Sequence, residues 1–373
     1  MIYFDNAATA WPRPPKVSVA VTEALNKAGN PGRGAHESAA WAAEKIYSVR
    51  EKTAKLFNIQ DPLQVAFTYN ATYALNMAIN MARGEITATS MDHNSVLRQV
   101  FARGYYNIVK AESDGHIDPE KIIHRIKDKT GTVIMSHASN VTGEIFDIKP
   151  IASFCKKRGI LFILDCSQTA GVVPIDVEKL DVDIMCFPGH KGLLGPQGTG
   201  GLYVRKGIKP KPLLRGGTGS KSFLPVQPEE FPDCLESGTL NTHGIAGLGA
   251  SIDFINSIGV EKIHSREKQL REYFISLVGK MPQVRIYGSQ EGYFTGTVSI
   301  NVEGFHSSQV AQYLSEKGIA VRGGIHCAPL AHKTLGTDDG GTVRFSFGYF
   351  NNSTQIDFAV RVIKQIVATK HKI

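Results

Sequence analysis

The sequence predicts an α/β protein, with a mostly parallel sheet that carries helices on both faces and a smaller α+β domain beside it. Apolar strand-like segments alternate with helical segments along the N-terminal part of the 373-residue chain. Strands that alternate with helices form a buried, parallel sheet through right-handed crossovers. Several of these strands end in polar residues, and such sheets bind ligands beyond the carboxyl ends of their strands. We therefore expect one ligand site at that edge of the sheet.

The first elements follow from proline placement and hydrophobic spacing. Residues 1–15 are rich in proline and are expected to form an extended arm, because proline is excluded from helix interiors. Apolar spacing then predicts helices over 16–27 and 38–57. Strands of the sheet are predicted at 64–68, 85–89, 131–135, 160–164, 183–188 and 201–205, with helices at 73–79 and 148–158.

The chain changes character after the last of these strands. Residues 209–238 are dense in proline and glycine and are interpreted as a long packed loop. A helix over 244–258 closes the large domain, predicted to span 16–258, and the small domain is predicted to combine 1–15 with 259–373. Helices of the small domain are expected at 261–278, 307–317 and 354–368, and strands at 295–301, 319–322 and 342–347.

Composition excludes several classes of protein. The net charge is +8 and the pI is near 9.1, but the basic residues are scattered, so we expect a solvated surface and no nucleic-acid partner. No apolar stretch approaches the ~20 residues of a membrane span, and the first residues lack the features of a signal peptide, so a cytoplasmic location is expected. The five cysteines have no C-x-x-C spacing and are expected to be reduced thiols.

Lys191 is the first candidate for a reactive group. It follows the apolar run that ends at Pro188-Gly189, and a glycine-rich loop comes after it. A lysine buried at a strand end has a lowered pKa, and its neutral amine can form a Schiff base with an aldehyde. A lone lysine on a turn is more often a surface residue, so the functional interpretation depends on the residues around it.

Other strand ends supply those residues. The strand, turn and helix around Ala71-Thr72 would direct free backbone N–H groups to one point, as a phosphate site requires. Asp165 ends a fully apolar strand, where a carboxylate stays charged only if it is paired. His93, Asn140 and Gln168 occupy comparable positions. Together with Lys191 they suggest a pyridoxal-phosphate site, in which a carboxylate keeps the pyridine nitrogen protonated.

These motifs resemble the cysteine desulfurase and selenocysteine lyase family, within the class V aminotransferases of the type I pyridoxal-phosphate fold. The likeness extends over nearly the whole chain. Its most specific parts are Asp165-Cys-Ser-Gln168, Gly189-His-Lys191, Glu236-Ser-Gly-Thr239 and Val321-Arg-Gly-Gly-Ile-His-Cys327. The resemblance implies a homodimer that binds pyridoxal 5'-phosphate and acts on L-cysteine, or on L-selenocysteine, and that passes sulfur to an acceptor protein.

The resemblance also implies roles for individual residues around the cofactor. Lys191 would bind the cofactor aldehyde, Asp165 would meet the pyridine nitrogen and His93 would stack on the ring. Asn140 and Gln168 would lie near the phenolic oxygen. The phosphate would be held by the Ala71-Thr72 turn, by His190 and by Thr239 of the other subunit.

Cys327 and two arginines complete the expected site. Arg344 would bind the substrate carboxylate as a two-pronged donor, with Arg322 and Asn140 nearby. Arg322 and His326 flank Cys327 and could favour its thiolate, the form that attacks the substrate sulfur. Lys191, with His93, would move the Cα proton. The expected reaction converts L-cysteine to L-alanine and leaves a persulfide on Cys327.

Some residues depart from the family pattern. Ile325 stands where the group II branch commonly has a histidine, Pro188 replaces a serine, and Ala71 replaces the first threonine of the phosphate turn. The short Cys327 loop, with Pro329 just after it, still favours a group II-like protein. Selenocysteine lyase activity, a non-catalytic sulfur-relay scaffold, and a transaminase or epimerase of the same superfamily stay open as alternatives, and no metal is expected.

Overall fold

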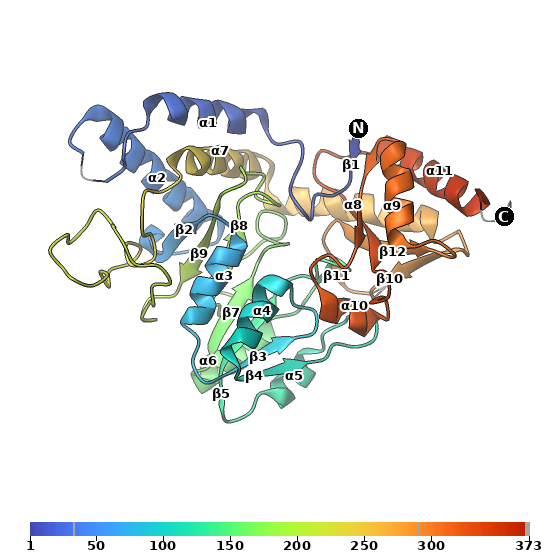
Figure 1. The fold of residues 1–373 in the computed structure, drawn as a ribbon, viewed down its shortest axis with the longest axis horizontal. Coiled ribbons are helices and arrows are strands. Elements are labelled where there is room, and N and C mark those ends of the chain that lie inside the picture. The colour runs from blue at the N-terminus through green and yellow to red at the C-terminus, as the bar shows by residue number, and fades with distance from the viewer. Residues whose placement is uncertain (33, 290, 370–373) are drawn as a thin grey trace.

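The large sheet has seven strands, and all but one run parallel. The computed structural model describes residues 1–32, 34–289 and 291–369 (Figure 1). In spatial order the strands are β2 (Val65–Thr68), β9 (Gly200–Val204), β8 (Ile184–Pro188), β7 (Leu161–Asp165), β5 (Thr130–Ser136), β3 (Glu85–Thr89) and β4 (Tyr106–Val109). Strand β9 is antiparallel to both neighbours, because it follows β8 through one loop rather than a crossover helix. The predicted fold class is confirmed.

Helices cover both faces of this sheet, as predicted. The alternation of side chains along a strand explains how two cores arise: in β7, Phe162 and Leu164 pack into one core, and Leu161 and Ile163 into the other. The first core includes side chains of α2 (Glu37–Leu56), α6 (Lys149–Arg158) and α7 (Thr242–Ile258), and the second those of α3 (Ala71–Asn80) and α4 (Asn94–Arg103). The remaining helices of this part are α1 (Pro15–Lys27), α5 (Pro119–Arg125) and the short 3-10 helix η1 (Pro62–Gln64).

The C-terminal part forms a second, antiparallel sheet with its own core. Its strands, in spatial order, are β10 (Val284–Tyr287), β12 (Thr297–Val302), β15 (Thr342–Ser346) and β14 (Arg322–Gly324). The helices of this part are α8 (Val260–Val278), α9 (Ser307–Glu316), α10 (Pro329–Leu335) and α11 (Ser353–Thr369). Figure 1 shows these elements grouped to one side of the seven-stranded sheet.

The N-terminal arm joins this second part. Strand β1 (Ile2–Tyr3) pairs in parallel with β13 (Ile319–Ala320), and Phe4 is buried in the same core as Phe345. A two-stranded ribbon of β6 (Glu144–Ile145) and β11 (Tyr293–Phe294) links the two parts. Gly259, with φ of 92°, separates α7 from α8. The domain division at residue 258 stays a prediction.

Most expected elements lie where the sequence places them, to within a few residues. Residues 209–238, all of them described, contain no helix or strand, as expected for a packed loop. No element was predicted at β4, β10, α4, α5 or α10. Strands β4 and β10 have four residues and helices α5 and α10 have seven, too few to show a clear period. Helix α4 does have an apolar face, formed by Val96, Leu97 and Val100, which the sequence analysis overlooked. Among the described residues, no helix is long and apolar enough to cross a membrane.

Candidate active site

Lys191 lies in a tight loop directly after β8. The N–H of Gly189 donates to the carbonyl of Thr199 at 2.8 Å, and the N–H of Gly195 donates to the carbonyl of Gly189 at 2.7 Å, so the loop folds back on its own start. A Cβ on residue 189 would lie 2.1 Å from the Thr199 hydroxyl oxygen, which explains the glycine. Burial lowers the pKa of Lys191 to about 8, although nearby Asp165 opposes the shift. The neutral amine is therefore a much larger fraction near physiological pH than in an ordinary lysine.

The strand ends place most of the predicted cofactor residues around one pocket. Asp165 ends β7, and Lys191 lies just beyond the end of the neighbouring β8. The side chain of Asp165 is 3% exposed, and its Oδ1 accepts hydrogen bonds from the N–H and hydroxyl of Ser167. No described residue donates to Oδ2. The pocket is lined by Ala71, Thr72, His93, Asn140, Asp165, Gln168, His190 and Lys191, with Asn70, Ser95, Ser136, Ala138, Ser167 and Pro188.

Two helix N-termini meet at this pocket. Ala71 and Thr72 lie in the first turn of α3, whose backbone N–H groups have no partner within the helix. Ser95 lies in the first turn of α4, and its hydroxyl is 2.8 Å from that of Thr72. The positive ends of two helix dipoles and two hydroxyls thus face one point, which suits an anion. The sequence analysis missed Ser95; its position directly after the His93-Asn94 helix start was the available signal.

His93 is held as a neutral imidazole. It caps α4, and its Nδ1 accepts a hydrogen bond of 3.0 Å from the N–H of Ser95. Burial, together with the positive charges of Lys191 and Arg322, lowers the pKa of His93 to about 3. Because Nδ1 acts as an acceptor, the ring proton resides on Nε2.

Asn140, Gln168 and His190 are fixed by contacts with distant segments. The Asn140 amide donates to the carbonyl of His326 at 2.7 Å, and the Gln168 amide donates to the carbonyl of Ala7 at 3.3 Å. His190 Nδ1 lies 3.1 Å from the hydroxyl of Thr9, and burial lowers its pKa to about 4. The N-terminal arm therefore holds two lining residues, Gln168 and His190, in place.

Arg344 is buried beside Asn140, a lining residue of the pocket, and is not itself one of the lining residues. Its Nη2 donates to Asp5 Oδ1 at 2.9 Å and its Nη1 donates to the carbonyl of Asn140 at 3.0 Å. Its Nε is buried and has no hydrogen-bond partner among the described residues. Its Nε–H and the second hydrogens of Nη1 and Nη2 are thus left for a further acceptor.

Cys327 is the exposed cysteine of the chain; the other four are buried. Residues His326 and Cys327 have φ values of 51° and 58°, a left-handed conformation that is uncommon outside glycine. Arg322 Nη2 lies 3.7 Å from Cys327 Sγ, and the carbonyl of Cys327 accepts a hydrogen bond of 2.8 Å from the N–H of Asn94 at the start of α4. The thiol therefore faces the opening beside His93.

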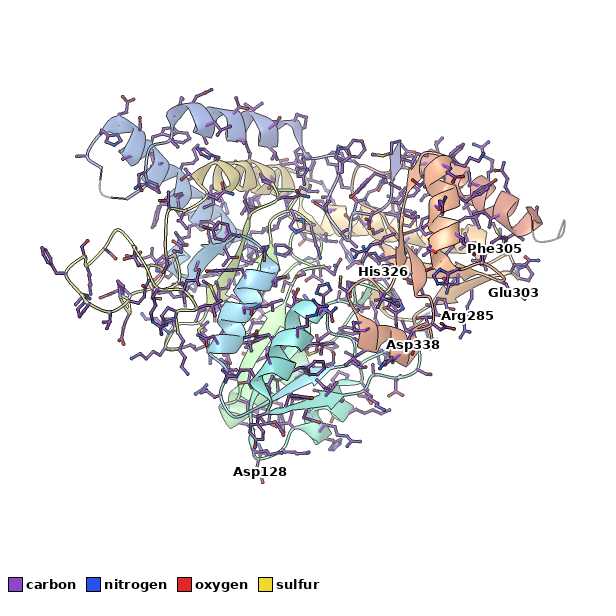
Figure 2. All side chains as sticks on the ribbon, in the orientation of Figure 1. Asp128, Arg285, Glu303, Phe305, His326 and Asp338 are labelled. Atoms are coloured by element: carbon purple, nitrogen blue, oxygen red, sulfur yellow. The ribbon has the colours of Figure 1, made fainter. Side chains whose placement is uncertain are left out.

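The expected positive charge on His326 is wrong. Its Nε2 lies 3.1 Å from the carbonyl of Thr342, and burial lowers its pKa to about 2. His326, labelled in Figure 2, packs against His332 of α10, with 5.4 Å between the ring centres and 48° between the ring planes. Because His326 is neutral, the positive charge in contact with the thiol comes from Arg322, and Lys191 and Arg344 act on it from further away. Among the described residues, no group of three or more His, Cys, Asp or Glu side chains could hold a metal ion.

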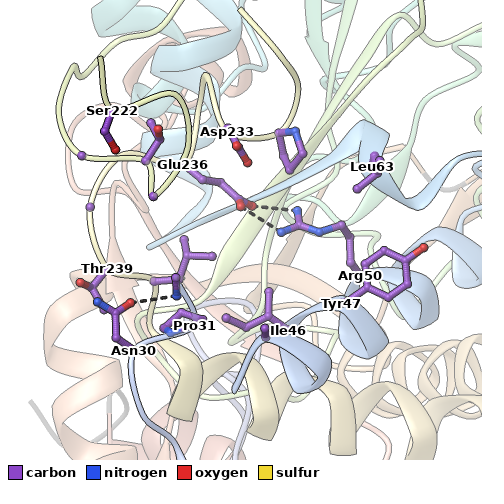
Figure 3. A pocket seen from close by; sticks show the side chains of 18 residues that line it. Asn30, Pro31, Ile46, Tyr47, Arg50, Leu63, Ser222, Asp233, Glu236 and Thr239 are labelled. Carbon is purple, nitrogen blue, oxygen red and sulfur yellow. Dashed lines mark hydrogen bonds and ion pairs between the residues drawn. The ribbon is translucent and has the colours of Figure 1, made fainter. Parts of the chain in front are cut away.

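Thr239 lies away from the lysine pocket. It lines a separate cavity of about 570 Å³ with Arg50 and Glu236 (Figure 3). This cavity is larger than the lysine pocket. Of its three charged lining residues, Arg50 and Glu236 neutralise each other in a buried ion pair, and the third is Asp233. Within one chain, Thr239 cannot reach a ligand held at Lys191.

Comparisons with known proteins agree with this geometry. Residues 2–358 match the family model described as Aminotransferase class-V. A probable cysteine desulfurase of Methanothermobacter thermautotrophicus is 34% identical, over 98% of this chain and 94% of its own. The cysteine desulfurase of Haloferax volcanii is 28% identical, over 97% and 88%.

Solved structures show the same fold. The apo structure of cysteine desulfurase from Thermococcus onnurineus NA1 superposes with a TM-score of 0.91 at 31% identity, covering 99% of this chain and 95% of that one. The cysteine desulfurase CsdA (S-sulfonic acid) from Escherichia coli gives 0.88 at 28% identity, covering 98% and 94%. The chain belongs to the aminotransferase class-V family, and its fold is the one that these cysteine desulfurases share.

Proposed function

We propose that this protein is a pyridoxal-phosphate-dependent cysteine desulfurase, which converts L-cysteine to L-alanine and transfers the sulfur to Cys327. The observation that carries the proposal is the juxtaposition of two reactive groups. A lysine with a lowered pKa lies in a polar pocket, and the exposed Cys327, within 3.7 Å of Arg322, lies at the opening beside that pocket. A transaminase or epimerase would give this thiol no role.

The pocket residues fit pyridoxal phosphate. Asp165 has a buried carboxylate with one oxygen free of protein donors, as a protonated pyridine nitrogen requires. The first turn of α3, with Thr72 and Ser95, suits the phosphate, and Lys191 suits the aldehyde. His93 would stack on the ring, and Asn140 and Gln168 would contact its oxygen. When bound there, the cofactor would draw electrons from the substrate and weaken its Cα–H and Cβ–S bonds.

The chain's own groups would carry the proton and the sulfur. Lys191 Nζ accepts the Cα proton, since His93, with a pKa of about 3, is too weak a base for that step. The Cys327 thiolate, oriented by Arg322, attacks the substrate sulfur. The new S–S bond forms as Cβ–S breaks, and the electron pair stays with Cβ, which takes up the proton released when Cys327 ionised. Lys191 then returns its proton to Cα. Alanine leaves, and Cys327 retains the sulfur as a persulfide.

Arg344 would bind the substrate carboxylate. Its free Nε and the remaining hydrogens of its Nη atoms are the donors that this requires, while Asp5 and the carbonyl of Asn140 hold the guanidinium in place. Arg322, which lies between this region and Cys327, would assist.

We further propose that the protein is a homodimer, that it acts in the cytoplasm, and that it passes sulfur to an acceptor protein. Thr239 lies outside its own chain's pocket, so it could contribute to a site only across an interface. The loop that precedes it exposes the apolar side chains of Leu214, Phe223, Leu224 and Val226, which a second subunit would cover.

A single-turnover experiment tests the proposal. Without reductant, wild-type protein should form about one alanine per chain from L-cysteine and carry a persulfide on Cys327. Cys327→Ala should lose this burst, whereas Cys155→Ala, which changes a buried thiol, should retain it. Alanine formation by Cys327→Ala at the wild-type rate would remove Cys327 from the mechanism. L-Selenocysteine is tested as a second substrate in the same experiment. Its selenol is ionised at neutral pH and does not need Cys327, so turnover of the two substrates can be compared in Cys327→Ala.

A further inference from the structure

An open groove of about 270 Å³ lies in front of Cys327. Helices α3 and α4 form its walls, and it is lined by Thr72, Asn76, His93, Asn94, Ser95, Arg98, Gln99 and Cys327. It shares Thr72, His93 and Ser95 with the lysine pocket, but Asn76, Arg98 and Gln99 belong to the groove and not to the pocket. A molecule in this groove would therefore meet the thiol from outside, while the lysine pocket holds the amino-acid substrate.

The charged side chains at the groove are all positive. Helix α3 carries no charged residue, and α4 carries only Arg98 and Arg103. The Arg98 side chain is exposed, and no described residue forms a hydrogen bond or an ion pair with it. Arg322, which does not line the groove, contacts Cys327 Sγ and no carboxylate among the described residues. An exposed arginine is often simply solvated, but this one lines the groove that holds the chain's exposed thiol, and no acidic residue lines that groove.

We propose that this groove receives the sulfur acceptor, and that Arg98 selects acceptors whose thiol is accompanied by a carboxylate. The inference rests on the proposed function, because it requires a persulfide on Cys327. The amide side chains of Asn76 and Gln99 supply further hydrogen-bonding groups along the groove. Arg98 acts by placing the acceptor and contacts neither the amino-acid substrate nor the cofactor.

The transfer step balances without any oxidant. The acceptor thiolate attacks the outer sulfur of the Cys327 persulfide and forms a new S–S bond. The old S–S bond breaks, Cys327 leaves as a thiolate, and the proton on the outer sulfur stays with the acceptor's persulfide. A carboxylate close to the attacking thiolate adds negative charge, which Arg98 and Arg322 offset during the approach.

Discharge of the persulfide by small thiols of different charge tests the inference. Wild-type enzyme loaded with one sulfur is mixed at low ionic strength with mercaptopropionate, mercaptoethanol or cysteamine, and rates are corrected for each thiol's ionised fraction. We expect mercaptopropionate to react fastest and cysteamine slowest, with a spread of roughly 3- to 10-fold that shrinks in high salt. Arg98→Gln should reduce the differences in rate between the three thiols, and Arg98→Glu should reverse their order.

The controls separate this inference from the proposed function. Arg103→Gln changes the other cation of α4, which lies outside the groove, and should keep the wild-type order. The alanine burst should be unchanged in all Arg98 variants. An order that Arg98→Glu does not alter overturns the inference while the proposed function stands, and absence of any persulfide overturns both.

A final arm distinguishes a small acceptor from a protein acceptor. A short synthetic peptide with cysteine between aspartates is compared with mercaptopropionate, each with wild-type and Arg98→Glu enzyme. If Arg98→Glu lowers the discharge rate of both acceptors by the same factor, a small acidic thiol is sufficient as the acceptor. A dependence at least several-fold larger for the peptide indicates an acidic segment of an acceptor protein.

Discussion

The buried ion pair between Arg50 and Glu236 should be the most costly ion pair to break. Arg50 Nη1 and Nη2 donate to the two carboxylate oxygens at 2.8 and 2.9 Å, and Glu236 Oε1 also accepts from the N–H of Phe67 at 2.6 Å. Both side chains are about 5% exposed. Glu236→Ala would leave the buried guanidinium with only the carbonyl of Val65 as an acceptor, and would leave the Phe67 N–H of strand β2 without its acceptor.

The size of the effect follows from burial. Removing one partner of a buried ion pair costs about 3–5 kcal/mol. Unfolding entropy is about 2.1 cal/mol/K per residue, so for 373 residues the Tm should fall by roughly 5 °C. The measurement is thermal unfolding followed by calorimetry at fixed protein and cofactor concentration.

A matched exposed pair provides the control. Lys52, also on α2, meets Asp253 at 2.6 Å, but the two side chains are 34% and 53% exposed. Asp253→Ala should cost less than about 1 kcal/mol and shift the Tm by about 1 °C. The double change Arg50→Met with Glu236→Leu should recover most of the loss, because no charge is then left buried. If Glu236→Ala and Asp253→Ala lower the Tm equally, the burial argument is refuted.

Other predictions concern the site and its pH dependence. Arg344→Lys should raise the KM for L-cysteine by on the order of 10- to 100-fold, because lysine lacks the planar guanidinium that can bind both Asp5 and a substrate carboxylate. An unchanged KM, measured in steady-state assays of folded protein, would contradict this role of Arg344. Burial raises the pKa of Glu267 from 4.5 to about 8, so folding favours its protonated form and the stability of the wild-type protein should fall as pH rises through that interval. In curves of Tm against pH, Glu267→Gln should show a smaller fall than the wild type. Parallel curves for the two proteins would contradict this assignment. Cofactor-free protein should bind pyridoxal phosphate at a rate that rises with pH and levels off above about pH 8, because the neutral Lys191 amine is the nucleophile. The rate is followed by absorbance. A rate that keeps rising toward pH 10.5 would mean that the pKa of Lys191 is not lowered.

The sequence alone determined the fold class and which residues end the strands. Apolar runs of β5, β7 and β8 are buried along nearly their whole length, and a run of that kind between helices has few other stable arrangements. Polar residues directly after such runs, as at Asp165 and Lys191, must then lie at one edge of the sheet. For this reason the candidate cofactor residues could be named before their distances were known.

Tertiary structure decided the rest, because the deciding contacts join residues far apart in the chain. Arg344 meets Asp5, and Asn140 meets His326, and no local pattern predicts either pair. Local sequence indicated a charged His326, whereas burial against Thr342 keeps it neutral. Likewise, Arg98 is an ordinary helix residue in sequence, and only the packing of α4 beside the Cys327 loop places its charge in front of the thiol. Electrostatic environment depends on what surrounds a group in three dimensions, and the order of residues does not specify that directly.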